Sequence, residues 1–312
     1  MSINRIIRAV CATPWAIVPE KLEVILEVLE LRAQGIDVLG AEPQAAETRP
    51  RTQVSGAIAV MPLFGIIGQR MNMVMPASGP STSTEQFGAM FDALVQNPDI
   101  SAIVLEVDSP GGSVYGVDEL SEKIFHARAE KTIIAIANSL ATSAAYYIAS
   151  AAEKVWVTPT GEVGSIGVYA MHVDWSKANE MEGVKPTYIS AGKYKVEGNP
   201  DEPLTDGAAA AMQVRVDDYY DLFVKAVARN RGVRPADVRG GFGEGRVVGA
   251  RDAITAGMAD KVGSMDELRA KLGSKLQADT RRRAQARGRK LDLVERELDG
   301  YDAEWPPGCF VQ

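Results

Sequence analysis

Between about residues 56 and 157 the sequence alternates apolar runs with segments of helical periodicity, and this alternation constrains the fold more than any other feature. The apolar runs cover residues 56–63, 102–107, 132–137 and 154–157. The helical patterns cover residues 84–96 and 116–129, and a third begins at Ser143. Strands joined by crossover helices lie parallel in one sheet. The sequence therefore predicts an α/β fold with a largely parallel sheet.

The segments around this alternating region have other patterns. Residues 19–34 predict an amphipathic helix with Pro19 in its first turn, and a polar linker follows over 41–53. Residues 70–83 are rich in Met, Ser, Gly and Pro without periodicity and predict a loop. Residues 206–231 predict a long helix.

These patterns divide the chain into three regions. We expect an N-terminal helical extension and linker over residues 1–53, a compact domain over 54–273 and a basic tail over 274–312. Residues 275–290 contain seven basic residues but a single acidic one, Asp279. The basic residues are Lys275, Arg281, Arg282, Arg283, Arg287, Arg289 and Lys290. Two interpretations stay open for this tail: a solvated, partly helical extension, or a docking arm for an acidic partner.

Composition excludes several classes of protein. A net charge of −7 over 312 residues disfavours a general nucleic-acid binder. The only cysteines, Cys11 and Cys309, form neither a disulfide framework nor a metal motif, so we expect a reducing compartment and no cofactor. The N-terminal apolar run contains Pro14 and ends at Glu20, which is too short for a membrane span or anchor.

Ser143 is the candidate nucleophile. It stands among small residues at the start of an apolar helical run, and Ala144 and Ala145 would let a substrate backbone approach closely. Free backbone N–H groups at a helix N-terminus favour developing negative charge. The structural alternative is that Ser143 or Thr142 serves only as an N-cap.

The segment 108–113, Asp-Ser-Pro-Gly-Gly-Ser, follows a predicted strand and precedes a predicted helix. This position lies at the carboxyl end of the sheet, where the sites of α/β proteins form. Adjacent glycines allow backbone N–H groups to point at a ligand oxygen, so we expect the Gly112 and Ala144 N–H groups to form an oxyanion hole. The alternative is a turn that needs glycine for backbone reasons alone.

Lys195 is the candidate general base, because the chain has only two histidines and a Ser-Lys pair is a known variant of the nucleophile–base arrangement. It lies in a polar stretch, 192–195, just beyond a predicted strand. A neutral lysine requires its pKa to fall about three units from roughly 10.4, a cost of about 4 kcal/mol supplied by burial. Lys193 projects to the same face of an extended strand, so spacing alone leaves both lysines open.

These segments together resemble the S49 peptidases, the signal peptide peptidase A family, over about residues 54–273. The resembling segments are residues 108–112, 142–150, 161–168, 192–195, 245–250 and 256–263. The resemblance implies a crotonase/ClpP-like superhelical fold and a serine endopeptidase with a Ser143–Lys195 dyad, which places the base on Lys195 rather than Lys193. It also assigns Gly111 and Ser165 to substrate binding.

The same resemblance includes phage head-maturation proteases. It implies an oligomeric ring or dome and extended protein or peptide substrates with small residues flanking the cut. The expected lack of a membrane anchor, the N-terminal helix and the basic tail favour the phage or prophage branch. The substrates would then be capsid scaffold and head proteins, including this chain's own tail, in the bacterial cytoplasm or the procapsid, with no nucleic acid required.

Four alternatives stay open. A ClpP-type triad would use Ser143, His172 and Asp174, whereas His126 lies in a charged helix and is expected to be solvated. A crotonase-type acyl-CoA enzyme would share the fold and the glycine turn. The chain could also be a cellular peptidase that degrades signal peptides, or an inactive capsid assembly factor.

Overall fold

The computed structural model describes residues 10–11, 13–33, 51–70 and 81–302. The chain divides into two compact units, residues 1–265 and 266–312, and each is described by itself. Most of the linker predicted over 41–53 and of the loop predicted over 70–83 lies outside the described residues.

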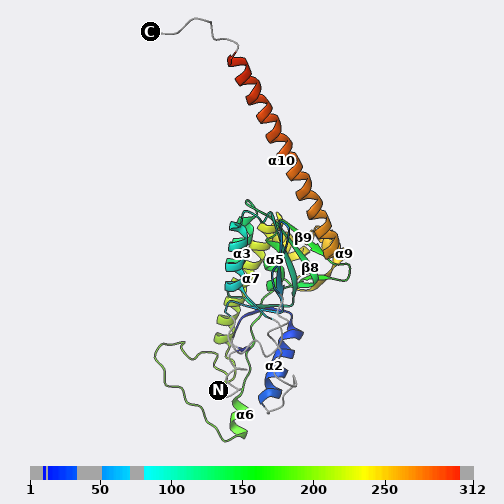
Figure 1. The fold of residues 1–312 in the computed structure, drawn as a ribbon. Helices are drawn as coiled ribbons and strands as arrows, with labels where there is room; N and C mark the ends of the chain where they lie inside the picture. Colours follow the sequence, from blue (N-terminus) through cyan, green and yellow to red (C-terminus); the bar gives the residue numbers. More distant parts are fainter. Residues whose placement is uncertain (1–9, 12, 34–50, 71–80, 303–312) are drawn as a thin grey trace, which may run out of the picture. The chain divides into compact units, whose positions relative to one another are not determined.

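A mixed sheet, eight-stranded within the described residues, forms the centre of the first unit (Figure 1). Its main path runs β11-β10-β8-β6-β3-β2, and β9 pairs with both β8 and β12. The strands are β2 (Gln53–Ser55), β3 (Ile58–Phe64), β6 (Ala102–Ser109), β8 (Thr132–Thr142), β9 (Lys154–Val157), β10 (Glu162–Gly164), β11 (Val247–Gly249) and β12 (Lys261–Val262). The pairings of β6 with β3 and β8, and of β8 with β9 and β10, are parallel. The predicted α/β class with a largely parallel sheet is confirmed.

A second, smaller sheet lies against the carboxyl ends of these strands. Its order is β1-β7-β4-β5, with β1 (Trp15–Ile17), β7 (Gly111–Ser113), β4 (Ile66–Gly68) and β5 (Ser81–Ser83). β7 begins two residues after β6 ends and β4 begins two residues after β3 ends, so both strands continue from the main sheet. Residues 81–83, which the sequence predicts as loop, form a strand by pairing with β4.

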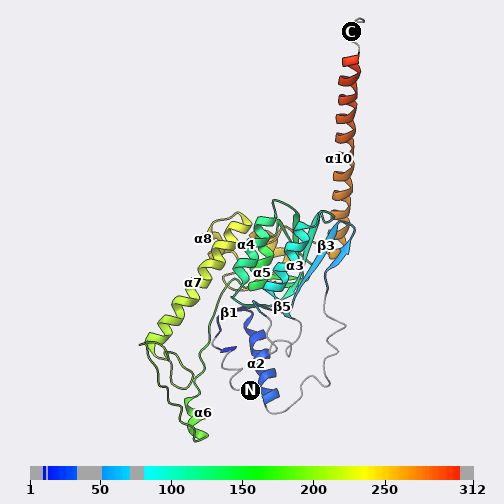
Figure 2. The same cartoon turned by 60° about the vertical axis from the view of Figure 1, so that its left-hand side comes forward.

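Helices cover the main sheet and carry the chain between its strands (Figures 1 and 2). In chain order the first unit holds α2 (Pro19–Ala33), α3 (Thr84–Gln96), α4 (Val117–Ala127), α5 (Ala144–Ser150), α6 (Ser176–Met181), α7 (Asp206–Arg231), α8 (Pro235–Gly241) and α9 (Ala250–Ala256). Ser83 caps α3 by accepting from the Gln86 N–H, and Gly232 ends α7 at φ 67°. The helices predicted over 84–96 and 206–231 match α3 and α7 residue for residue.

Two local predictions differ from the structure. The strand predicted over 132–137 forms and extends further, to Thr142, because residues 140–142 pair with β10. The strand predicted before Gly192 does not form: residues 182–205 are all described, and they make turns and irregular backbone. This stretch, the lysine segment, extends away from the sheet between α6 and α7 (Figures 1 and 2).

Within the described residues, the second unit consists of most of helix α10 (Met265–Asp302), so the predicted basic tail is helical over its described part. Among the described helices, none is both long and apolar enough to cross a membrane.

Candidate active site

Ser143 stands between β8 and α5 in an unusual backbone conformation. Its φ of 54° and ψ of −122° are rare for a residue with a side chain and persist only where the surroundings impose them. Its N–H donates to the Gly164 carbonyl at 2.7 Å, and its carbonyl accepts from the Tyr147 N–H at 2.9 Å. The side chain makes no capping hydrogen bond although Ser143 occupies the N-cap position, so the interpretation as a mere cap finds no support.

The glycine turn packs directly against Ser143. Gly111 has a φ of 102°, and a Cβ added to it would lie 2.9 Å from the Ser143 Cβ and 2.2 Å from the Ala16 carbonyl oxygen. Only glycine fits such a position. The Ser109 Oγ fixes the turn because it donates to the Gly65 carbonyl at 2.6 Å and accepts from the Gly111 N–H at 3.1 Å.

The other predicted site residues on this side lie next to the nucleophile in the chain or in space. Ala144 is the first residue of α5, where a backbone N–H has no partner within the helix. Gly112 follows Gly111 in β7. Ser165 follows the Gly164 carbonyl that holds Ser143, has a φ of 51°, and donates its N–H to the Arg246 carbonyl at 2.8 Å. Their roles as oxyanion donors and substrate contacts stay predictions.

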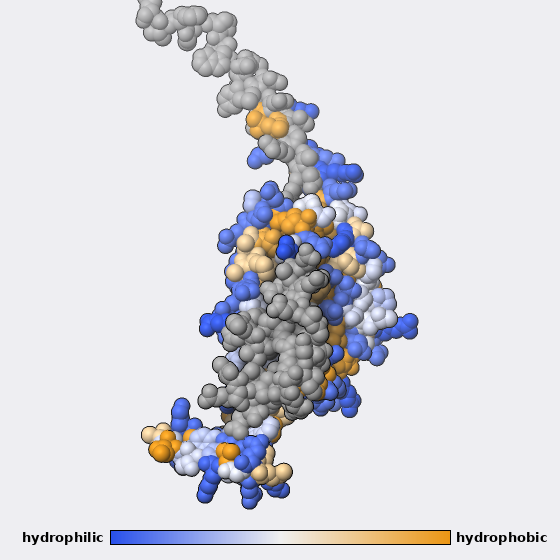
Figure 3. All heavy atoms as spheres, turned by 60° about the horizontal axis from the view of Figure 1, so that its bottom comes forward, coloured by the Kyte–Doolittle hydropathy of each residue, from blue (hydrophilic) through white to orange (hydrophobic). Residues whose placement is uncertain are grey.

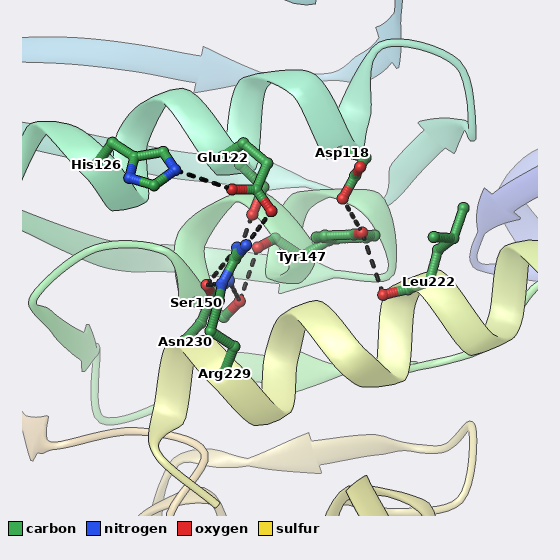
Figure 4. A network of polar contacts seen from close by, with 9 residues as sticks. Asp118, Glu122, His126, Tyr147, Ser150, Leu222, Arg229 and Asn230 are labelled. Carbon is green, nitrogen blue, oxygen red and sulfur yellow. Dashed lines mark hydrogen bonds and ion pairs between the residues drawn. The ribbon is translucent and has the colours of Figure 1, made fainter.

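A polar network fixes helix α5 behind the nucleophile (Figure 4). The Tyr147 hydroxyl donates to Asp118 Oδ1 at 2.6 Å and lies 3.3 Å from the Leu222 carbonyl oxygen. Burial, together with the Asp118 carboxylate, raises the pKa of Tyr147. Ser150 and Asn230 continue the network: the Asn230 amide donates to the Ser150 Oγ at 3.0 Å. Helices α4, α5 and α7 are thereby joined by hydrogen bonds.

A cavity of about 280 Å³ opens beside the glycine turn. Its walls are mostly apolar and come from several elements, with Ala16, Val114, Val117, Tyr147, Val168, Leu222 and Phe223 among the lining residues. Asp118 and Glu119 lie at the same cavity. The sequence carries no signal for this pocket, because its walls are separated in the chain by up to about two hundred residues and meet only in the fold.

The structure does not bring Lys195 to Ser143. Lys195 and Lys193 are exposed in a series of turns, in which the Lys195 N–H donates to the Gly192 carbonyl at 3.1 Å. Ser143, by contrast, is 1% exposed. The burial that a neutral lysine base needs is therefore absent at Lys195 in the single chain.

The histidines are engaged elsewhere. The His172 Nε2 lies 3.1 Å from the Asn199 carbonyl oxygen, and this contact helps to close the base of the lysine segment. Asp174 accepts from the Ser176 N–H at 2.8 Å, and its interactions with Ser176 lower its pKa. His126 is exposed on α4, as predicted, and its Nε2 lies 3.3 Å from a Glu122 carboxylate oxygen (Figure 4). The triad through His172 thus finds no support.

The fold and the site define a class of protein: an α/β protein with a serine in a strained backbone conformation beside a glycine turn at the carboxyl edge of a parallel sheet, an arrangement suited to acyl transfer. Residues 126–279 match Peptidase family S49, and they include both Ser143 and Lys195. The chain carries a domain of the S49 peptidase family, as its motifs predict.

Two curated phage proteins are similar in sequence. Capsid assembly protease C of Escherichia phage lambda is 35% identical over 217 residues, which are 69% of this chain and 49% of that protein. Head-tail preconnector protein GP5 of Enterobacteria phage P21 is 31% identical over 254 residues, 81% of this chain and 50% of that protein. The chain thus spans about half the length of these relatives. Among solved structures, a point mutant of ClpP1 from Listeria monocytogenes aligns at a TM-score of 0.42 with 15% identity, over 66% of this chain and 92% of that one.

Proposed function

We propose that this protein is a serine endopeptidase whose nucleophile is Ser143 and whose general base is Lys195. The observation that carries the proposal is the geometry at Ser143, where a strained backbone, the close approach of Gly111 and a neighbouring helix N-terminus meet in one place. These features suit attack on a carbonyl and stabilisation of the oxyanion that results.

The exposed Lys195 leads to a second part of the proposal: a second copy of the chain supplies the base. The lysine segment exposes large apolar side chains where it protrudes from the molecule (Figure 3). Ile189 is 99% exposed, Tyr194 62% and Val184 52%. Apolar side chains gathered on one protruding segment are typical of a surface that another chain covers. Burial in such an assembly would also desolvate Lys195 and favour its neutral form.

In the proposed reaction, neutral Lys195 accepts the Ser143 proton while the Ser143 Oγ adds to the scissile carbonyl carbon. The Gly112 and Ala144 N–H groups bind the oxyanion. Lys195 then returns the proton to the leaving amine, and water hydrolyses the acyl-enzyme by the reverse sequence of proton transfers. No step requires a cofactor.

We infer the biological substrates from the phage relatives. Both are named for capsid assembly or the head–tail connection, so the proposed substrates are scaffold and head proteins processed during phage head assembly. The cytoplasm of the bacterial host, including the procapsid, is the proposed place of action.

The first experiment follows intact mass over time for casein incubated with wild-type protein, Ser143→Ala and the control Ser101→Ala. Ser101 is an exposed serine at the other end of the sheet. We expect fragments with wild type and Ser101→Ala, and none with Ser143→Ala. Fragments at the wild-type rate from Ser143→Ala would contradict the assignment.

An inactive assembly factor is the alternative favoured by a specific observation, the exposure of Lys195 in the single chain. Size-exclusion chromatography of the same samples separates the two functions. An assembled wild-type protein that cleaves neither casein nor candidate scaffold protein would favour the assembly factor.

A further inference from the structure

The N-terminal strand β1 passes beside Ser143 in an extended conformation. Both of its edges are paired: it runs antiparallel to β7, with Trp15 opposite Ser113 and Ile17 opposite Gly111. On its other edge, Trp15 exchanges two backbone hydrogen bonds with Tyr169, at 2.9 and 3.0 Å. Pairing along sheet edges is a general way for proteins to hold an extended peptide.

The register places one peptide bond of β1 at the nucleophile. The ideal Cβ position on Gly111 is 2.9 Å from the Ser143 Cβ, 2.2 Å from the Ala16 carbonyl oxygen and 3.1 Å from the Ile17 Cα. The last two atoms belong to the peptide unit that joins Ala16 to Ile17. That peptide unit and the Ser143 side chain therefore pack against the same α-carbon. Ala16 is also in register with Gly112, the predicted oxyanion donor.

Further hydrogen bonds continue this pairing beyond both ends of the strand. The Val114 N–H donates to the Pro14 carbonyl at 3.5 Å, and the Val18 N–H donates to the Pro110 carbonyl at 3.1 Å. The chain is thus paired on both sides of the peptide bond that lies beside Ser143, as a substrate of an endopeptidase must be.

The side chains of β1 divide between two environments. Trp15 and Ile17 pack into a small apolar cluster with Leu22 and Ile25 of α2, which anchors the strand. Ala16 points to the opposite side and lines the cavity of about 280 Å³ beside the glycine turn. All three residues of β1 are at most 3% exposed. The methyl group of Ala16 occupies little of a pocket that has room for a larger apolar side chain.

We propose that residues 14–18 are an internal occupant of the substrate groove, held in substrate register with the peptide bond between Ala16 and Ile17 presented to Ser143. This inference rests on the proposed peptidase function and adds a control element to it. Because the occupant is tethered, its effective concentration at the groove is on the order of millimolar or higher. An external polypeptide must displace it before Ser143 can act.

The test changes how well the side chain at position 16 fits the apolar cavity. Ala16→Asp places a carboxylate in an apolar cavity beside Asp118 and Glu119, whereas Ala16→Leu extends an apolar side chain into the same space. We expect Ala16→Asp to raise the rate of casein cleavage several-fold and Ala16→Leu to lower it several-fold. Val24→Asp, the same kind of change at a half-exposed position of α2, should leave the rate unchanged.

A second measurement does not depend on activity. Amide hydrogen exchange of residues 111–114 is compared between Ser143→Ala and the double variant Ser143→Ala with Ala16→Asp. Faster exchange in the double variant shows that β1 has left β7. A new N-terminus at Ile17 in wild type but not in Ser143→Ala also supports the inference, since the acyl-enzyme would then form on Ala16 and release the amine of Ile17.

Three results distinguish the two proposals. Folded Ala16 variants that cleave casein at the wild-type rate overturn the internal occupant while the peptidase stands. Unchanged exchange at residues 111–114 in the folded double variant overturns it as well. In the third result, neither wild type nor any variant cleaves a substrate, but the exchange difference is present. The proposed peptidase function then fails, whereas the pairing of β1 beside Ser143 is supported.

Discussion

The two halves of the proposed dyad differ in how the chain holds them. Ser143 is 1% exposed and fixed by backbone hydrogen bonds between a parallel strand and a helix that is itself tied to two neighbouring helices. Lys195 lies in an exposed series of turns outside the sheet. The proposed nucleophile is therefore held in place within one chain, whereas the proposed base is not.

This difference suggests how such an enzyme avoids acting too early. Under the two proposals, the pairing of β1 beside Ser143 and the exposure of Lys195 would be two independent barriers to cleavage in the single chain. Assembly would remove the second barrier by covering the lysine segment, and a competing polypeptide would remove the first. The predictions below test the two halves separately, from the largest expected effect to the smallest.

The largest effect should come from Lys195, and it should affect activity alone. We expect Lys195→Ala to lower the casein cleavage rate by at least about 10³-fold, since general-base removal disables the nucleophile. The melting temperature should not change, because the side chain is exposed. Lys193→Ala is the matched control and should keep most of the activity; the reverse result would move the base to Lys193.

Co-expression sharpens the comparison further. If a second copy supplies the base, co-assembled Ser143→Ala and Lys195→Ala chains form some sites with both groups intact, about a quarter of all sites for random mixing. A base supplied within the same chain predicts no recovery above the single variants. Cleavage assays on the purified mixed assembly separate these outcomes.

A smaller effect on rate, accompanied by a loss of stability, should follow from Gly111→Ala. The added Cβ would meet the Ala16 carbonyl oxygen and Ser143 at distances that atoms do not tolerate, at a φ that disfavours alanine. We expect roughly a 10²-fold loss of kcat/KM and a destabilisation of about 1–3 kcal/mol. Gly240→Ala, where nothing lies within 4 Å, should change neither urea unfolding nor activity.

Tyr147→Phe tests the support behind the nucleophile through stability. Removal of the hydroxyl leaves the partly buried Asp118 carboxylate and the Leu222 carbonyl without that donor, which should cost about 1–3 kcal/mol in urea unfolding. Tyr194→Phe, at an exposed position of the lysine segment, should have the stability of wild type. Equal stability of both variants would show that the network of Figure 4 contributes little.

The contrast between Ser143 and Lys195 also explains which features could be predicted from the sequence. The parallel strands, α3, α7 and the position of Ser143 follow from local periodicity and from small residues at a strand–helix junction. Residues close to them in the sequence largely determine where these elements form. The serine and its glycine turn lie together because adjacent parallel strands end at one edge.

Other features depend on contacts that no local pattern encodes. Residues 14–18 form an apolar stretch of ordinary composition, and only the register with β7 shows that it passes the nucleophile. The cavity has walls from α4, α5 and α7, and no motif marks it. The expected strand before Gly192 fails because residues 182–205 have no neighbouring strand among the described residues with which to pair.

The smallest predicted effect concerns how the free energy of unfolding changes in acid, and it involves Asp260, which directly precedes β12. Burial raises the pKa of Asp260, but hydrogen bonds from Arg231 and the Val155 N–H outweigh it and hold the pKa below its ordinary value. A depressed pKa contributes stability above the unfolded value of about 3.9, and this contribution is lost as the pH falls through the folded value. Wild type should therefore lose stability below about pH 4 more steeply than Asp260→Asn, whereas at pH 7 the variant should be less stable by about 1–3 kcal/mol. Urea unfolding at a series of pH values measures both effects. Parallel pH profiles for the two proteins would show that Asp260 does not couple folding to protonation.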